Sequence, residues 1–217
     1  YIDLYEVTNW DYAEFLNSAL EQGLIFVDQY SASMNSFDLI LLSEYDCEIN
    51  YQNGKFVVKP GKDDYPVVEV TWYGANAYAQ YYEKRLPTEA EWEKAARSTD
   101  KRLYPWGNDT PTNYDCNFGQ VMGGPTPVGY YSPNGESAYG CADMAGNVWE
   151  WCADWYDPAY YRNSPGSNPT GPKKGQYKVA RGGSWFSNLL EIRTISRSFG
   201  IIRAENGNTG FRCAKTP

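Results

Sequence analysis

The chain of 217 residues contains no histidine. Histidine supplies ligands of catalytic zinc and of the facial triad of non-haem iron enzymes, and it is the general base of Ser-His-Asp catalysis. Its absence therefore excludes most hydrolase and oxygenase mechanisms before any motif is considered.

A long apolar run is also lacking. The longest apolar-rich stretch, residues 37–42, is far shorter than the about 20 residues that a membrane-spanning helix needs. No positively charged and then apolar leader precedes it. The formal charge of −8 disfavours contact with phosphate backbones and anionic lipids. We therefore expect neither nucleic acid as a partner nor insertion into a membrane.

The five cysteines show no metal-binding spacing of the CxxC type. Two interpretations stay open. Either one or two disulfides form in an oxidising compartment and leave one thiol over, or all five side chains are buried thiols. The residues concerned are Cys47, Cys116, Cys141, Cys152 and Cys213.

Aromatic residues, in contrast, are abundant. The chain has 20 tyrosines and 8 tryptophans, which is typical of a protein that buries or presents flat, amphipathic side chains. Its length favours one compact domain with a substantial core.

Local patterns predict several regular elements. Thr8 with Asp11, and Thr88 with Glu91, have the spacing of helix capping boxes, and Asn53-Gly54 suits the type I′ turn of a hairpin. Residues 104–175, rich in Gly, Pro, Asn, Asp and Tyr, show almost no periodicity. The expected elements are helices over residues 6–20, over 73–84 and after Thr88, a hairpin over 47–59, an extended segment over 66–71, and central strands over 148–151 and 179–184.

Two groups of residues have both a functional and a structural interpretation. Glu89, Glu91 and Glu93 invite a comparison with paired catalytic carboxylates, but on a capped helix they favour a solvated first turn. Trp149, Trp151, Trp155 and Tyr156 could form a stacking platform for sugar, whereas alternation in a strand places Trp149 and Trp151 on one face, which favours the core.

Five segments carry a resemblance to a known family. They read GCADMAGNVWEWCADW at residues 140–155, RGGSW at 181–185, GFRCA at 210–214, RLPTEAEWEKAAR at 85–97 and YPWGN at 104–108. In content and order the set resembles the formylglycine-generating enzyme (sulfatase-modifying factor) family. The resemblance implies one α+β domain over residues 1–217, of the C-type-lectin-like fold with much irregular structure. It also implies a further N-terminal strand upstream of Tyr1.

The resemblance fails at the family's catalytic cysteines. In the family two copper-binding cysteines follow RGGS in the form RGGS-aromatic-x-C-x-x-x-x-C, and the matching positions here are Ser187 and Ile192. A hydroxyl binds Cu(I) poorly and an alkyl group does not bind it, because soft thiolates are the ligands that Cu(I) requires. We therefore expect no copper and no catalytic residue of the oxidase type.

The resemblance also implies a calcium site. The family's ligands carry over to the side chain of Asp143, the carbonyls of Gly146 and Val148, and the carboxylate of Glu150. Such oxygen donors suit a hard cation. In the alternative interpretation, Asp143 caps a turn and Glu150 pairs with Arg181 or Arg212.

The segment after RGGSW carries large apolar side chains where relatives generally show polar ones. The residues around this segment keep the family pattern, whereas the side chains within it are atypical. This combination resembles the variable proteins of diversity-generating retroelements, which present a ligand-binding face at this C-terminal segment. We therefore expect a recognition face over residues 185–203, with Arg181, Arg193 and Arg212 as its framework; in the alternative, these side chains are core. The residues expected to contact a ligand or partner are Trp185, Phe186, Ser187, Asn188, Leu189, Leu190, Phe199, Ile201 and Ile202.

Together these observations predict a non-catalytic, extracytoplasmic binding or assembly module. Its partner would be a protein or another surface ligand, and self-association is included. Two alternatives stay open. The chain could be an enzyme of the family with altered or degenerate chemistry, or it could be the subunit of a polymer in which a neighbour's strand completes each copy.

Overall fold

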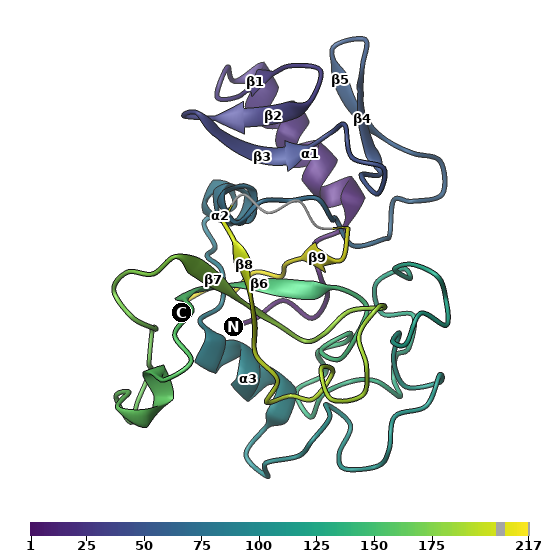
Figure 1. Ribbon diagram of the computed structural model, residues 1–217. Coiled ribbons are helices and arrows are strands. Elements are labelled where there is room, and N and C mark those ends of the chain that lie inside the picture. Colours follow the sequence, from purple (N-terminus) through teal and green to yellow (C-terminus); the bar gives the residue numbers. More distant parts are fainter. Residues whose placement is uncertain (203–206, 217) are drawn as a thin grey trace.

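The computed structural model describes residues 1–202 and 207–216, and it has the expected α+β composition with much irregular structure. One end of the molecule holds α1 and β1–β5, the other holds the main sheet with α3, and α2 lies between them (Figure 1). Residues 98–148 contain no helix or strand. The elements are α1 (Asn9–Glu21), β1 (Phe26–Val27), β2 (Ser31–Met34), β3 (Phe37–Leu41), β4 (Ile49–Gln52), β5 (Lys55–Val58), α2 (Trp72–Tyr81), α3 (Glu89–Arg97), β6 (Trp149–Trp155), η1 (Tyr160–Arg162), β7 (Tyr177–Arg181), β8 (Ser198–Ile201) and β9 (Thr209–Gly210).

Both predicted capping boxes are present. The Thr8 hydroxyl accepts from the Asp11 amide at 3.1 Å, and the Asp11 carboxylate accepts from the Thr8 amide at 3.3 Å. Thr88 and Glu91 make the same exchange at the start of α3. Trp10 does not belong to the buried stripe of α1, because it is 55% exposed. The helix starts are therefore set by local chemistry that the sequence shows directly.

The predicted hairpin is also confirmed. β4 and β5 pair antiparallel, and Asn53 and Gly54 have φ angles of 52° and 79°, as a type I′ turn requires. The helix predicted over residues 73–84 ends earlier, at Tyr81. Glu83, with a φ of 54°, lies outside helical geometry. In the segment 66–71, only Pro66 and Val70 form isolated β-bridges, with Thr8 and with Ile40 of β3.

A four-stranded sheet in the order β8-β7-β6-β9 organises the second half of the chain. β6 pairs antiparallel with β7 and parallel with β9, so the two strands expected at the centre lie there. Trp151 is buried in the main core, and Trp149 packs against that core. The Trp151 ring is therefore not accessible to a sugar. Gly200 in β8 faces the Trp151 ring so closely that a Cβ would overlap it.

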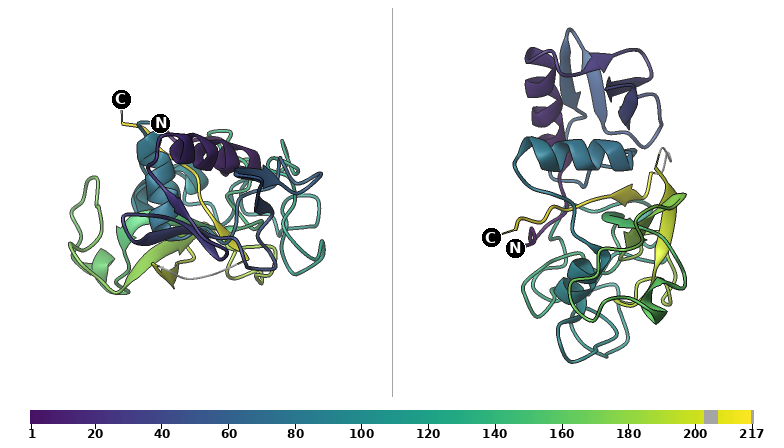
Figure 2. Two further views of the ribbon diagram at one scale, coloured as in Figure 1. Left: turned by 90° about the horizontal axis from the view of Figure 1, so that it is seen from above. Right: turned by 90° about the vertical axis from the view of Figure 1, so that its left-hand side faces the viewer.

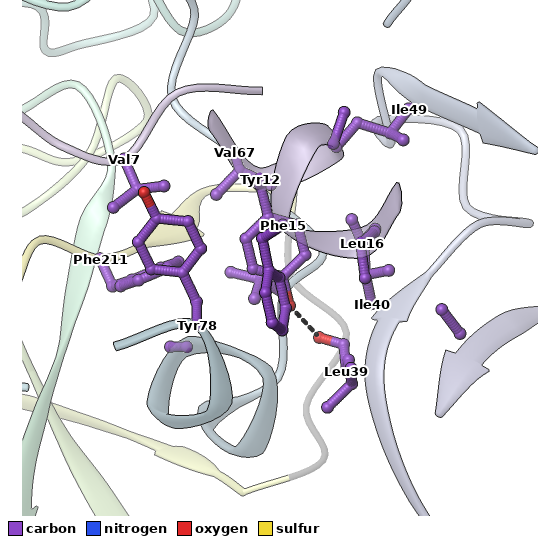
Figure 3. Close-up of a cluster of buried hydrophobic side chains, with 14 of the residues drawn as sticks. Val7, Tyr12, Phe15, Leu16, Leu39, Ile40, Ile49, Val67, Tyr78 and Phe211 are labelled. Carbon is purple, nitrogen blue, oxygen red and sulfur yellow. Dashed lines mark hydrogen bonds between the residues drawn. The ribbon is translucent and has the colours of Figure 1, made fainter. Parts of the chain in front are cut away.

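The main core lies between α1, α2 and the strands around them (Figure 3). Tyr12 stacks on Tyr78, and its hydroxyl donates to the carbonyl of Leu39 at 3.2 Å. Gly74 permits this contact, because a Cβ there would overlap both the Leu39 carbonyl and the Tyr12 hydroxyl. The two ends of the chain lie side by side in both views of Figure 2, and the amino group of Tyr1 donates to a carbonyl at the other end at 2.8 Å.

All five cysteines are buried and free, so the disulfide interpretation is wrong and the interpretation as five thiols holds. Burial raises the pKa of Cys47 to about 11 and that of Cys213 to about 12. Neutral, inaccessible thiols of this kind are inert as nucleophiles and as metal ligands. In the described part of the chain, no helix is long and apolar enough to cross a membrane.

Candidate functional site

Arg181, the first residue of the RGGS segment, fixes the loop that follows it. The side chain is fully buried, and its guanidinium donates to the carbonyls of Thr194 at 2.9 Å and of Ser196, and to Glu93 at 2.7 Å. These bonds attach residues 194–196 to the sheet and to α3. Arg181 is therefore a framework residue, as expected. Arg193, in contrast, is only half-buried. Its Nε is buried and has no hydrogen-bond partner among the described residues.

The two positions of the family's copper ligands are both closed. Ser187 is buried, its hydroxyl accepts from the Ser184 amide at 3.1 Å, and its carbonyl accepts from the Gly119 amide at 2.9 Å. Ile192 is fully buried and belongs to a cluster that includes Cys116. The Ser187 side chain thus closes a tight turn, and its contact with a ligand stays a prediction.

Large apolar side chains of the expected recognition face are exposed to solvent. The exposed fractions are 56% for Phe186, 60% for Leu190, 47% for Phe199 and 58% for Ile201, and Leu189 is also exposed. The ring of Phe199 rests on Tyr156 and Tyr177, and it is held in place by them. Whether this surface binds a partner stays a prediction.

The remaining residues of the expected face have mixed roles. The Asn188 side chain accepts from the Leu190 amide at 2.8 Å and so shapes the turn. Trp185 is half-buried, and its indole nitrogen has no partner among the described residues. Ile202 is half-buried, and its carbonyl accepts from the Trp72 amide. Residue 203, the last of the expected face, lies outside the described residues.

The block expected to bind calcium is buried and already bonded. The Asp143 carboxylate accepts from the Gly129 amide at 2.6 Å. Both oxygens of Glu150 accept from Arg212, at 2.7 and 2.8 Å, and one of them also accepts from the Trp92 indole. Asp143 thus caps a turn and Glu150 pairs with Arg212, as in the alternative interpretation. Gly146 packs so closely on the Asn117 carbonyl that no Cβ would fit.

The charges in this block are nevertheless unbalanced. Glu6, Asp143 and Glu150 are buried together, and the only guanidinium that pairs with them in the described structure is Arg212. Burial raises the pKa of Asp143 to about 6 and the pKa of Glu6 well above its ordinary value. Among the described residues, however, no three acidic or cysteine side chains are arranged to hold a metal. The calcium site stays a prediction.

A second buried charge network, which the sequence did not reveal, joins α3 to the main sheet. Glu89 is 1% exposed, and Arg197 binds both of its oxygens at 2.6 and 2.8 Å. The expectation that Glu89 is solvated is therefore wrong, because the first turn of α3 packs on the sheet and requires a cationic partner. Glu91 is exposed, as expected, and Glu93 bridges two arginines.

The same network contains a lysine between two indoles. The Lys178 ammonium lies 3.9 Å from the Trp72 ring and 4.1 Å from the Trp155 ring, and it donates to the Ala153 carbonyl at 2.7 Å. Burial lowers its pKa to about 8 and raises that of nearby Asp154 to about 6. Cation–π contacts and a hydrogen bond compensate part of this desolvation.

Two cavities adjoin α3. The larger has a volume of about 940 Å³, is mostly apolar and includes Tyr1, Leu86 and Ala153 in its wall. No residue of the expected recognition face lines it. The smaller has a volume of about 350 Å³ and includes Arg197.

A family model described as the sulfatase-modifying factor enzyme 1-like domain matches residues 1–217. The chain is 41% identical over 219 residues to the serine/threonine-protein kinase pkn1 of Chlamydia caviae, covering 99% of this chain and 32% of that protein. It is 43% identical over 171 residues to the formylglycine-generating enzyme of Streptomyces coelicolor, covering 71% of this chain and 54% of the enzyme. The chain thus spans about a third of the chlamydial relative and about half of the Streptomyces one.

Solved structures share the fold at low sequence identity. Treponema denticola variable protein 1 matches with a TM-score of 0.67 and 22% identity over 100% of this chain and 84% of that one. PvdO from Pseudomonas aeruginosa matches with a TM-score of 0.67 and 22% identity, over 98% of this chain and 78% of that one. These likenesses establish the C-type-lectin-like fold of the formylglycine-generating type.

Proposed function

The chain belongs to the sulfatase-modifying factor enzyme 1-like family, and from this premise we propose that it is a non-catalytic binding or assembly module. Its recognition face lies on residues 185–203, and its partner is a protein or another surface ligand, a second copy of the chain included. The observation that carries the proposal is the state of the two copper positions. Ser187 and Ile192 offer no thiolate, and Ile192 is part of a packed cluster.

Copper does not fit these residues. Two thiolates give Cu(I) the soft ligands that it requires, whereas a hydroxyl that already accepts a backbone hydrogen bond and an alkyl side chain give it none. The described residues contain no free thiol that is exposed and could substitute, since all five cysteines are buried. The likeness to formylglycine-generating enzymes therefore supports a shared scaffold, and the oxidase activity does not follow from it.

The exposed apolar side chains support a partner surface. Phe186, Leu190, Phe199 and Ile201 each leave about half or more of their surface in water. The proposal takes these side chains as one apolar surface, since exposed apolar patches mark interaction sites in soluble proteins. Between Phe186 and Phe199 in the sequence, Arg181 fixes the loop through the carbonyls of Thr194 and Ser196.

The chlamydial relatives suggest a setting for such a module. The chain matches about a third of a protein named as a serine/threonine-protein kinase, and we propose that the domain serves as a recognition part of a larger protein. The kinase activity of that name is not transferred to this domain. An extracytoplasmic location rests on the family resemblance alone and stays a proposal.

We predict that Phe186→Ser combined with Phe199→Ser weakens association on the order of 100-fold or more. Burying one phenylalanine contributes about 1.5–3 kcal/mol, and about 1.4 kcal/mol corresponds to tenfold in affinity. Sedimentation of the purified protein measures self-association. A photoreactive phenylalanine analogue at position 186 in the intact cellular protein captures any other partner, and Phe199→Ser should then reduce the adduct.

Two controls distinguish a recognition face from a core. The photoreactive group at Tyr45, which is 94% exposed and lies elsewhere, should give no discrete adduct. The double variant should lose less than about 1.5 kcal/mol of stability, whereas Phe211→Ala in the main core should lose about 3–5 kcal/mol. A large loss of stability in the double variant with unchanged association would make these residues core and remove the proposal.

We also propose that the block around Asp143 holds one calcium ion. Its ligands would be the carboxylates of Asp143 and Glu150 and the carbonyls of Gly146 and Val148, all hard oxygen donors. Support comes from the buried excess of negative charge, in which Glu6 joins the two carboxylates. A bound ion would neutralise that excess in a region with little regular structure.

We expect calcium to raise the melting temperature. An ion at 100-fold excess over its dissociation constant adds about 2.7 kcal/mol, which corresponds to roughly 5 to 11 °C for a domain of this size. The test compares thermal unfolding with calcium and with chelator. Asp143→Asn is the matched variant, because the amide oxygen can still accept from Gly129 but carries no charge, so the calcium effect should shrink. Identical melting of the wild-type protein in both conditions would leave Asp143 as a turn cap only.

A further inference from the structure

The smaller cavity, at the C-terminal end of α3, has a basic wall. Its volume is about 350 Å³, and four of its side chains are basic: Lys94, Arg97, Lys101 and Arg197. Glu93 is the single carboxylate among them. This concentration of positive charge departs from a molecule whose formal charge is −8.

The carboxylates nearby are already matched. Glu93 binds Arg97 at 2.9 Å through one oxygen and the buried Arg181 at 2.7 Å through the other. Glu89 is bound through both oxygens by Arg197. In the described part of the chain, neither Lys94 nor Lys101 has a carboxylate within 4.0 Å. The wall therefore keeps a surplus of at least two positive charges.

The cations of the wall are positioned by different parts of the chain. The Arg197 guanidinium lies 5.0 Å from the Tyr156 ring and 5.0 Å from the Tyr161 ring, which fixes its plane. The Arg97 Nε is buried and has no hydrogen-bond partner among residues 1–202 and 207–216. Basic residues in the last turn of a helix complement its dipole. The helix dipole explains the presence of Lys94 and Arg97 in the last turn of α3. It does not explain Lys101 or Arg197, which lie outside this helix.

The backbone of the wall is strained as well. Ser98 has φ 59° and ψ −144°, a region that is almost confined to glycine, and Lys101 has a φ of 61°. Both residues line the cavity.

We propose that this cavity binds a phosphate monoester. A phosphate dianion supplies three strong acceptors and nearly two negative charges, which match guanidinium forks and lysine point charges. A carboxylate would neutralise only one of the surplus charges. The volume lies at the lower end of small-ligand sites, which suits one phosphate-bearing group rather than an extended cofactor. The cavity shares Arg197 with residues 185–203, but none of the exposed apolar side chains of that segment lines it, so the phosphate site does not depend on the proposed function.

Calorimetry at low ionic strength tests the site with phenyl phosphate, with a phosphotyrosine peptide and with the same peptide unphosphorylated. We expect the two phosphate probes to bind and the unphosphorylated peptide to be inert. Lys94→Glu combined with Lys101→Glu should weaken binding by about tenfold or more, because it reverses two charges that have no carboxylate partner among the described residues. Lys173→Glu combined with Lys174→Glu changes the net charge equally on an exposed loop and should leave binding nearly unchanged.

Each outcome is decisive for the site. Tighter binding of phenyl phosphate assigns it to a small phosphate ester, and tighter binding of the peptide assigns it to a phosphorylated residue; both support phosphate recognition. Absence of binding by both phosphate probes overturns the proposal. Equal weakening in the two double variants also overturns it, because the effect would then be one of net charge.

Discussion

Replacing Arg212 with alanine should destabilise the protein by about 3–5 kcal/mol, the range for breaking a buried ion pair by removing one partner. Arg212 and Glu150 are both fully buried, with bidentate contacts of 2.7 and 2.8 Å. The same guanidinium donates to the carbonyls of Leu4 and Ala142 at 2.8 Å each. Alanine would leave a buried carboxylate without its ion-pair partner and three carbonyls, that of Asp3 included, without this donor.

Denaturant unfolding measures this loss, and Arg85→Ala is the matched control. Arg85 also forms a bidentate pair, with Glu91, but both side chains are more than a third exposed, so its removal should cost about 1 kcal/mol or less. Adding Glu150→Gln to Arg212→Ala should recover part of the loss, because the unpaired charge disappears. Equal effects of Arg212→Ala and Arg85→Ala would show that Arg212 is not the anchor of this block.

The second large effect expected is a complete absence of oxidase activity. The chain should not convert the cysteine of a CxPxR-type peptide to formylglycine with copper and oxygen. Thiolates are the soft ligands that select Cu(I), and the residues at the two family positions are Ser187 and Ile192. Burial raises the pKa of Cys116, which packs with Ile192, so this thiol stays neutral and does not substitute.

Elements governed by neighbouring residues could be predicted from the sequence. The Thr8 and Thr88 capping boxes, and the Asn53-Gly54 turn, depend on groups within four residues of one another, and the structure has them. The exposure of Phe186 and Phe199 followed from their position between segments of family pattern. The helix predicted over residues 73–84 is present as α2, which ends at Tyr81.

Features that join distant segments could not be predicted. Glu89 is buried because Arg197, 108 residues later, neutralises it, and helix periodicity alone gives a solvated glutamate. The basic cavity is likewise formed by residues from the segment 90–101 together with Tyr161 and Arg197, which no local motif connects. The hydrogen bond between the Ser184 amide and the Ser187 hydroxyl could not be predicted either, because it has no sequence signature. The state of the cysteines depends on packing that spacing does not reveal.

Mass spectrometry of a CxPxR-type peptide, incubated with the purified protein, copper and oxygen, tests the central claim most directly. The Streptomyces coelicolor formylglycine-generating enzyme serves as the positive control in the same buffer. We predict an unchanged peptide mass with this chain and the aldehyde product with the control enzyme. Formylglycine produced by this chain above the level of a protein-free sample would contradict a non-catalytic role and make the chain an enzyme of its family.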